Sequence, residues 1–262
     1  MAKPIGESLS NPWSRYQKAN GSFKQRIIAA SFGEVGRLKT SFWLTAPAPI
    51  VIQSTDKGLE GVVDVFLNTL YKETGQTKDI YVVEYDPMVG IMAQEEAIEI
   101  RDTFEEDFKH ALEHARTVVW DKETNVYEIF KYAEFGAPSD SANNYYALDQ
   151  RYRHLINLAK DTEVNFGLIQ GMMDIWGTKV SNSGKLTGKK TDTRKRRGMR
   201  EIEELVHINI EHTVDEEGNF ILNIGKSRGP GGRDIQNQSI PYVTFPEFAM
   251  LVFPDSSEQD WV

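Results

Sequence analysis

The chain has 262 residues, a hydrophobic content of 40% and a formal net charge of −9, which fits one large α/β domain, or one with a small appendage, and excludes a disordered protein. It contains no cysteine, so disulfides, thiolate catalysis and zinc–thiolate sites are excluded. The N-terminus lacks the apolar stretch of a signal peptide, and no run reaches the roughly 18 apolar residues of a membrane span. We therefore expect a soluble protein of the cytoplasm.

Taken in chain order, residues 1–22 are rich in Ser, Pro, Gly and Asn and predict an N-terminal arm. In residues 23–240, short apolar runs alternate with amphipathic helical patterns. The expected strands are 24–32, 50–53, 79–85, 117–121, 165–170, 204–213 and 219–226. The expected helices are 40–44, 59–74, 93–115 and 145–160. Residues 241–262 predict a tail with one further strand or helix near 245–253.

This alternation defines the expected fold class. Several of the expected strands are continuous apolar runs, which is typical of strands buried on both faces. We therefore predict an α/β fold with a central, mainly parallel β-sheet flanked by helices, followed by C-terminal antiparallel strands.

A glycine loop follows the first expected strand. Residues 33–40, GEVGRLKT, nearly fit the phosphate-binding pattern G-x-x-x-x-G-K-[ST] and depart from it only at Leu38, where the pattern has glycine. Backbone N–H groups in such a loop point at phosphate oxygens, the lysine neutralises phosphate charge and the hydroxyl binds Mg²⁺. The predicted nucleotide-contacting residues are Gly33, Glu34, Val35, Gly36, Arg37, Leu38, Lys39, Thr40 and Ser41. The alternative is an ordinary strand–turn–helix junction with a surface lysine.

Three polar side chains follow apolar strands and are candidates to complete such a site. Asp121 ends the run VVWD and is predicted to orient Mg²⁺, Asp56 follows PIVIQST and could activate water, and Gln170 ends NFGLIQ and could sense the terminal phosphate. Each also has a plain structural interpretation as a turn or a solvated strand end.

A basic segment at 177–200 has a charge opposite to that of the whole chain. Between 179 and 200 there are five lysines, four arginines and one acid, a local charge of +8. We predict a mobile loop that contacts the phosphate backbone of nucleic acid, with a solvated loop as the alternative. The candidate contacts are Lys179, Lys185, Lys189, Lys190, Arg194, Lys195, Arg196, Arg197 and Arg200.

Lys226 and Arg228, in GKSRGPGG, stand two residues apart at the end of an expected strand. In an extended chain they face the same side. Such a pair could reach a phosphate bound by a neighbouring subunit. The alternative is a basic surface turn.

In this order, the motifs resemble the RecA-like P-loop ATPases and, more narrowly, the phage Sak-type recombination ATPases. The resemblance runs from about Ile27 to Arg228 and is carried by GEVGRLKTS, PIVIQSTDKG, VVWDKET, FGLIQ before the long polar segment, and GKSR. It implies a RecA-type core, ATP and Mg²⁺ at a subunit interface, a homo-oligomeric ring or filament, and single-stranded DNA as partner.

The resemblance also implies residue roles. Lys39 and Thr40 would take the P-loop roles, Asp121 would complete the Mg²⁺ site with Thr40, and Gln170 would be the sensor. Asp56 would be the catalytic carboxylate, one side-chain carbon shorter than the usual Glu, and Lys226 and Arg228 would act in trans. The predicted activity is hydrolysis of ATP coupled to DNA recombination or replication. Two alternatives remain. One is a RecA-fold DNA-binding or structural module that has lost hydrolysis, which the departure from the motif at Leu38 suggests. The other is a nucleotide-binding assembly factor that acts on protein.

Overall fold

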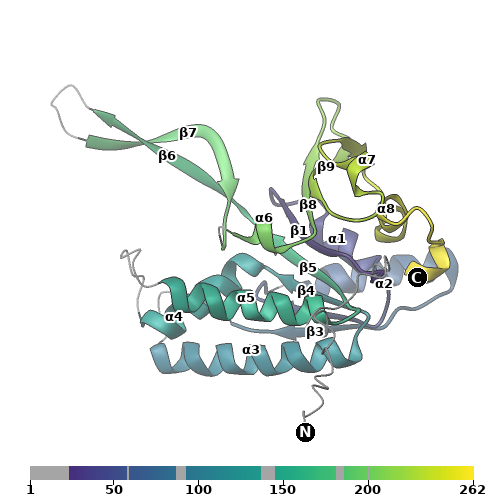
Figure 1. The fold of residues 1–262 in the computed structure, drawn as a ribbon, viewed down its shortest axis with the longest axis horizontal. Helices are drawn as coiled ribbons and strands as arrows, with labels where there is room; N and C mark the ends of the chain where they lie inside the picture. The colour runs from purple at the N-terminus through teal and green to yellow at the C-terminus, as the bar shows by residue number, and fades with distance from the viewer. Residues whose placement is uncertain (1–23, 58, 87–92, 137–144, 181–185, 200) are drawn as a thin grey trace, which may run out of the picture.

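The computed structural model describes residues 24–57, 59–86, 93–136, 145–180, 186–199 and 201–262, and between 176 and 193 it describes the backbone alone. The predicted arm at 1–22 lies outside the described residues. The central feature is an eight-stranded sheet with helices on both faces, from which a two-stranded hairpin projects (Figure 1). The strands of the sheet are β1 (Ile28–Gly33), β2 (Ile50–Ser54), β3 (Ile80–Glu84), β4 (Thr117–Asp121), β5 (Asn165–Gln170), β8 (Ile208–Val214), β9 (Phe220–Ser227) and β10 (Ser239–Pro241).

The strand order is β10-β9-β8-β1-β5-β4-β2-β3. Strands β8, β1, β5, β4, β2 and β3 run parallel, whereas β9 and β10 add to the β8 edge in antiparallel fashion. The predicted mainly parallel sheet with C-terminal antiparallel strands is confirmed. Because the central strands are parallel, their carboxyl ends lie along one edge of the sheet, where open α/β sheets bind ligands.

The helices pack on the sheet as two layers. One face carries α1, α2 and α8, and the other carries α3, α4 and α5 (Figure 1). The helices are α1 (Lys39–Leu44), α2 (Leu59–Thr74), α3 (Gln94–His114), α4 (Glu123–Phe135), α5 (Tyr145–Asp161), α6 (Ile202–Leu205), α7 (Gly232–Ile235) and α8 (Phe245–Val252), with a 3-10 helix at Glu258–Trp261. Within the part of the chain that the structure describes, no helix is long and apolar enough to cross a membrane.

The short helix α1 is fixed by its aromatic residues. Phe42 and Trp43 are fully buried, and Trp43 donates its indole N–H to Ser31 Oγ at 2.9 Å. Its ring lies so close to β5 that a Cβ on Gly167 would be 2.5 Å from it. Large aromatic side chains bury much apolar area, so they hold α1, and the loop before it, against β1 and β5.

The structure corrects several local predictions. The segment 177–200, expected as a loop, is mostly a β-hairpin of β6 (Met172–Val180) and β7 (Leu186–Arg196). The first residues of the strand expected at 204–213 belong instead to α6, and α4 was not anticipated. The strand or helix expected near 245–253 is confirmed as α8, which packs Phe245 and Phe248 against Phe42.

Candidate functional site

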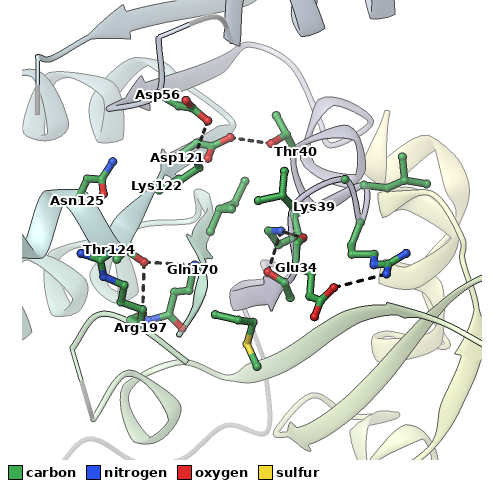
Figure 2. A pocket seen from close by; sticks show the side chains of 18 of the residues that line it. Glu34, Lys39, Thr40, Asp56, Asp121, Lys122, Thr124, Asn125, Gln170 and Arg197 are labelled. Atoms are coloured by element: carbon green, nitrogen blue, oxygen red, sulfur yellow. Dashed lines mark hydrogen bonds and ion pairs between the residues drawn. The ribbon is translucent and has the colours of Figure 1, made fainter. Parts of the chain in front are cut away.

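A cavity of about 710 Å³ opens at the carboxyl ends of β1, β4 and β5. Figure 2 shows its wall, where the glycine loop faces side chains that follow β2, β4 and β5. It brings together every residue predicted for the nucleotide site within one chain: Gly33, Glu34, Val35, Gly36, Arg37, Leu38, Lys39, Thr40, Ser41, Asp56, Asp121 and Gln170.

Three residues of the glycine loop have a positive φ. Gly33 has φ 146°, and a Cβ there would be 2.3 Å from the carbonyl oxygen of His212 on β8. Gly36 has φ 76°, and Leu38 adopts the left-handed conformation at φ 57° and ψ 20°. A residue with a Cβ is strained there by roughly 1–2 kcal/mol. Leu38 therefore occupies a glycine-like conformation without being glycine.

Lys39 is held across the loop that precedes it. Its Nζ donates to the carbonyl oxygens of Gly33 at 3.0 Å and Glu34 at 2.5 Å. Burial lowers the pKa of this ammonium, and the nearby Asp121 opposes the shift. Neutral carbonyls are weak partners for a desolvated cation, so an anion in the cavity would be a stronger one.

Thr40 and Asp121 form the candidate metal position. The Thr40 hydroxyl donates to Asp121 Oδ2 at 2.7 Å. Burial raises the pKa of Asp121, although the Thr40 hydrogen bond acts against the rise. Among the described residues no group of three or more His, Asp or Glu side chains could hold a metal ion alone. The pair nevertheless fits Mg²⁺, which takes one or two carboxylates and completes its shell with water and phosphate oxygens.

Asp56 reaches the cavity but already has a cationic partner. Its Oδ2 lies 2.7 Å from Lys122 Nζ, and both side chains are partly exposed. Lys122 follows Asp121 directly and also lines the cavity. To serve as a base, Asp56 must have its carboxylate free of this ion pair.

Gln170 connects the cavity to a buried carboxylate. Glu123, which is fully buried, accepts hydrogen bonds from Gln170 Nε2 at 2.8 Å, the Tyr152 hydroxyl at 2.9 Å and the Met199 backbone N–H at 3.4 Å. Burial raises its pKa to about 7 despite these donors. Gln170 Oε1 has no hydrogen-bond partner among the described residues. A Cβ on Gly198 would be 2.2 Å from Glu123 Oε2, so the end of the hairpin is packed tightly onto this cluster.

The arginines at the base of the hairpin have partners within the chain. Arg194 pairs with Glu34 of the glycine loop at 2.5 Å and with Asp174 at 2.9 Å. The guanidinium of Arg196 stacks 3.6 Å from the Phe32 ring centroid, and Arg197 lines the cavity. These three arginines therefore belong to the site and its support, which the sequence-based assignment to DNA did not anticipate.

The other candidate DNA contacts are placed as follows. Lys195 is exposed on β7. Lys179 lies on β6, and Lys189 and Lys190 lie on β7. Lys185 and Arg200 lie outside the described residues.

Lys226 and Arg228 lie far from the cavity within the chain. Ser227, between them, pairs with Ile208 at the start of β8, so both are at the amino edge of the parallel strands. Lys226 Nζ donates to the carbonyl oxygens of Glu203, Glu204 and Val206 at 2.7, 3.0 and 2.8 Å, and Arg228 is exposed. Arg228 is thus free to meet another molecule, whereas Lys226 caps α6.

Sequence reasoning missed some of the site. The residues after Asp121 line the cavity or support it: Lys122, Glu123, Thr124 and Asn125. The signal available was the polar run KETN directly after the apolar strand TVVWD.

No protein-family model matches the chain, and no curated protein matches it.

Proposed function

We propose that this chain is a RecA-like P-loop protein that binds ATP with Mg²⁺, hydrolyses it and binds single-stranded DNA in phage recombination or replication. The observation that carries the proposal is one cavity that contains a left-handed glycine loop, Lys39, the Thr40–Asp121 hydrogen bond and Gln170. A loop of this kind ahead of a helix offers backbone N–H groups to phosphate.

Each residue of the cavity has a separate role in binding or hydrolysing ATP. Lys39 exchanges its two carbonyl partners for phosphate oxygens, and Thr40 and Asp121 hold the Mg²⁺, which neutralises charge on the phosphates. Asp56, released from Lys122, accepts the proton of the attacking water. Gln170, which lines the cavity and donates to Glu123, senses the terminal phosphate.

A second copy of the chain completes the proposal. Arg228 cannot reach its own cavity from the amino edge of the sheet, so it acts on the nucleotide of a neighbour in a ring or filament. Lys226, bound to carbonyl oxygens of α6 and of Val206 just after it, positions that strand end. The hairpin β6–β7 contacts the DNA through Lys195, which is exposed, and through Lys179, Lys189 and Lys190 on its two strands.

A hydrolysis-deficient DNA-binding module is the second candidate, and two observations favour it. Leu38 strains the loop, and Asp56 is tied to Lys122. In that case ATP would be held without turnover.

The test is a steady-state ATPase assay with and without a single-stranded oligonucleotide. DNA-stimulated turnover that is lost in Lys39→Ala and Asp56→Asn supports the enzyme. ATP binding and DNA binding without turnover support the module, and absence of ATP binding contradicts both.

DNA binding is tested by replacing Lys189, Lys190 and Lys195 by Ala. Substituting Arg194, Arg196 or Arg197 would also disturb the site, as their in-chain contacts show. Removing one lysine that binds a DNA phosphate should reduce the slope of log affinity against log salt by roughly one unit. Unchanged affinity and slope would remove the hairpin from the DNA site, and absence of any DNA binding would favour the assembly-factor alternative.

A further inference from the structure

A second cavity, of about 340 Å³, lies at the amino edge of the sheet, at the opposite end of β1 from the glycine loop. Its size is at the lower end of the range of small-ligand pockets. Its wall combines cations with apolar groups, and no acidic residue is among the described residues that line it. The lining residues are Lys24, Arg26, His207, Ile208, Arg228, Gly229, Pro230, Val252 and Phe253.

Arg26, just before β1, is the central group. Its side chain is buried, with 8% of the residue exposed. Nη2 donates to the carbonyl oxygen of Lys160 at the end of α5, but Nε and Nη1 are buried with no partner among the described residues. An unpaired buried guanidinium is unfavourable, and the planar fork of Arg suits a bidentate oxyanion.

His207 and Arg228 are fixed beside it by the backbone. The N–H of His207 donates to Ile28 O at 2.9 Å, and the N–H of Arg228 donates to His207 O at 3.2 Å. Burial and the surrounding cations lower the pKa of His207 to about 4. The groups that act on the imidazole are Arg26, Lys160, Arg228 and Lys226.

Acidic side chains near this cluster do not enter the cavity. Asp161 and Glu163 act on Arg26, and Glu203 and Glu204 act on Lys226, but none lines the cavity and burial still lowers the pKa of Arg26. The positive charge is therefore compensated from outside the wall only.

We infer that this cavity binds a phosphoryl-type oxyanion, held by Arg26, His207 and Arg228. The site is separate from the glycine loop and does not depend on the proposed ATPase activity. Arg26 and His207 are newly assigned to a binding site here, because neither residue belongs to a motif identified in the sequence.

The experiment titrates inorganic phosphate into full-length protein and follows the histidine ring signals by NMR. To remove the glycine loop as a competing site, the chain carries Lys39→Ala. Phosphate should raise the pKa of His207 because an added anion stabilises its protonated form. His212, buried beside the glycine loop, should not respond and serves as the internal control.

Variants then test the assignment. Arg26→Met and Arg228→Gln should each weaken phosphate binding roughly tenfold or more, as expected for loss of a hydrogen bond between charged groups. The matched control is Arg233→Gln, an exposed arginine of α7, which should change nothing. Because Arg228 is exposed, its variant keeps the test open even if the Arg26 variant does not fold.

Absence of a His207 response, or equal phosphate affinity in all the variants, would overturn the inference. Two further probes identify the source of the oxyanion. A response to ATP in the Lys39→Ala chain indicates a terminal phosphate, and a response to an oligonucleotide without terminal phosphates indicates a phosphodiester. Either response supports the site.

Discussion

Charged side chains at the two ends of the parallel strands differ in whether they have partners within the described chain. At the carboxyl edge three charged groups of the cavity already have partners: Lys39 has carbonyl oxygens, Asp121 has Thr40, and Asp56 has Lys122. At the amino edge, two buried nitrogens of Arg26, Nε and Nη1, have no partner among the described residues. Within the described residues, the carboxyl edge is thus held by internal contacts, whereas at the amino edge the proposed anion would supply the partners that Arg26 lacks.

This contrast shows what each edge demands of a ligand. At the carboxyl edge a ligand must displace contacts that exist, so its affinity is a difference between two sets of interactions. At the amino edge, Nε and Nη1 of Arg26 have no partner among the described residues to lose, so the proposed anion would add hydrogen bonds without displacing any there. The following substitutions test this difference.

The largest expected effect is at Lys39. Lys39→Ala should lower ATP turnover by at least about 100-fold, since it removes a cation from a buried site of charge development. Phosphate binding at the amino edge should be unaffected. Turnover and phosphate titrations measure the two, with Lys72→Ala, an exposed lysine of α2, as the control. A parallel loss at both edges would mean that they are not independent.

The next effect compares two buried charges. Glu123→Ala should lower the free energy of unfolding by about 2–4 kcal/mol because it leaves three buried donors unsatisfied. In phosphate-free buffer, Arg26→Met should change it by less than about 1 kcal/mol, since the loss of one hydrogen bond is offset by removal of two buried nitrogens that have no partner among the described residues. Urea unfolding measures both, with the exposed Glu99→Ala as control. Equal losses would contradict the contrast.

Two histidines on and beside β8 give the third test. The pKa of His212 is lowered to about 3, chiefly by burial, and that of His207 to about 4. Below pH 6.5 the unfolded chain protonates these rings while the folded chain does not, so stability is present above pH 6.5 and falls as the pH decreases toward 3 or 4. His212→Leu should reduce this slope by as much as about 1.4 kcal/mol per pH unit.

Phosphate separates the two contributions. Bound phosphate should reduce the contribution of His207 to the pH dependence of the free energy of unfolding, because the anion lets the folded state take up the proton. The contribution of His212 should stay unchanged. Thermal unfolding at several pH values measures this, with the exposed His154→Leu as control. An identical phosphate effect in His207→Leu would contradict the assignment.

The smallest effect concerns Leu38. Leu38→Gly should raise the free energy of unfolding by at most about 1 kcal/mol, because relief of left-handed strain is offset by the greater entropy of the unfolded chain. Leu38→Ala keeps the strain and should give no gain. Urea unfolding of the two variants decides this, and a gain in both would show that φ at this position is not the cause.

The sequence supported the prediction of most of the fold. The runs at 117–121 and 165–170 were continuous and apolar, and both are strands with the expected bounds. The helix expected at 59–74 has those bounds too. Such patterns follow from local periodicity. The hairpin β6–β7 was missed because β7 is almost entirely polar and shows no apolar alternation, so that its strands are identified only by their pairing with each other.

The candidate site was predictable only in part. Gly33, Lys39 and Thr40 follow a local pattern, and Asp121 and Gln170 stand at strand ends, which parallel strands bring to one edge. Glu123 could not be found this way, because its burial depends on Tyr152 and Met199, which are distant in sequence. Arg26 and His207 were missed for the same reason.

The hairpin β6–β7 has a consequence for amide hydrogen exchange. Within the described chain each of its strands pairs only with the other, and an isolated two-stranded hairpin is only marginally stable in water. Its base is different, because the Arg197 N–H donates to Gly171 O and the Met199 N–H to Glu123. Exchange in the free protein should therefore become slower from Val180 and Leu186, the paired residues farthest from the sheet, toward 197–199, and a ligand that pairs with the outer edges of β6 and β7 would reverse that gradient.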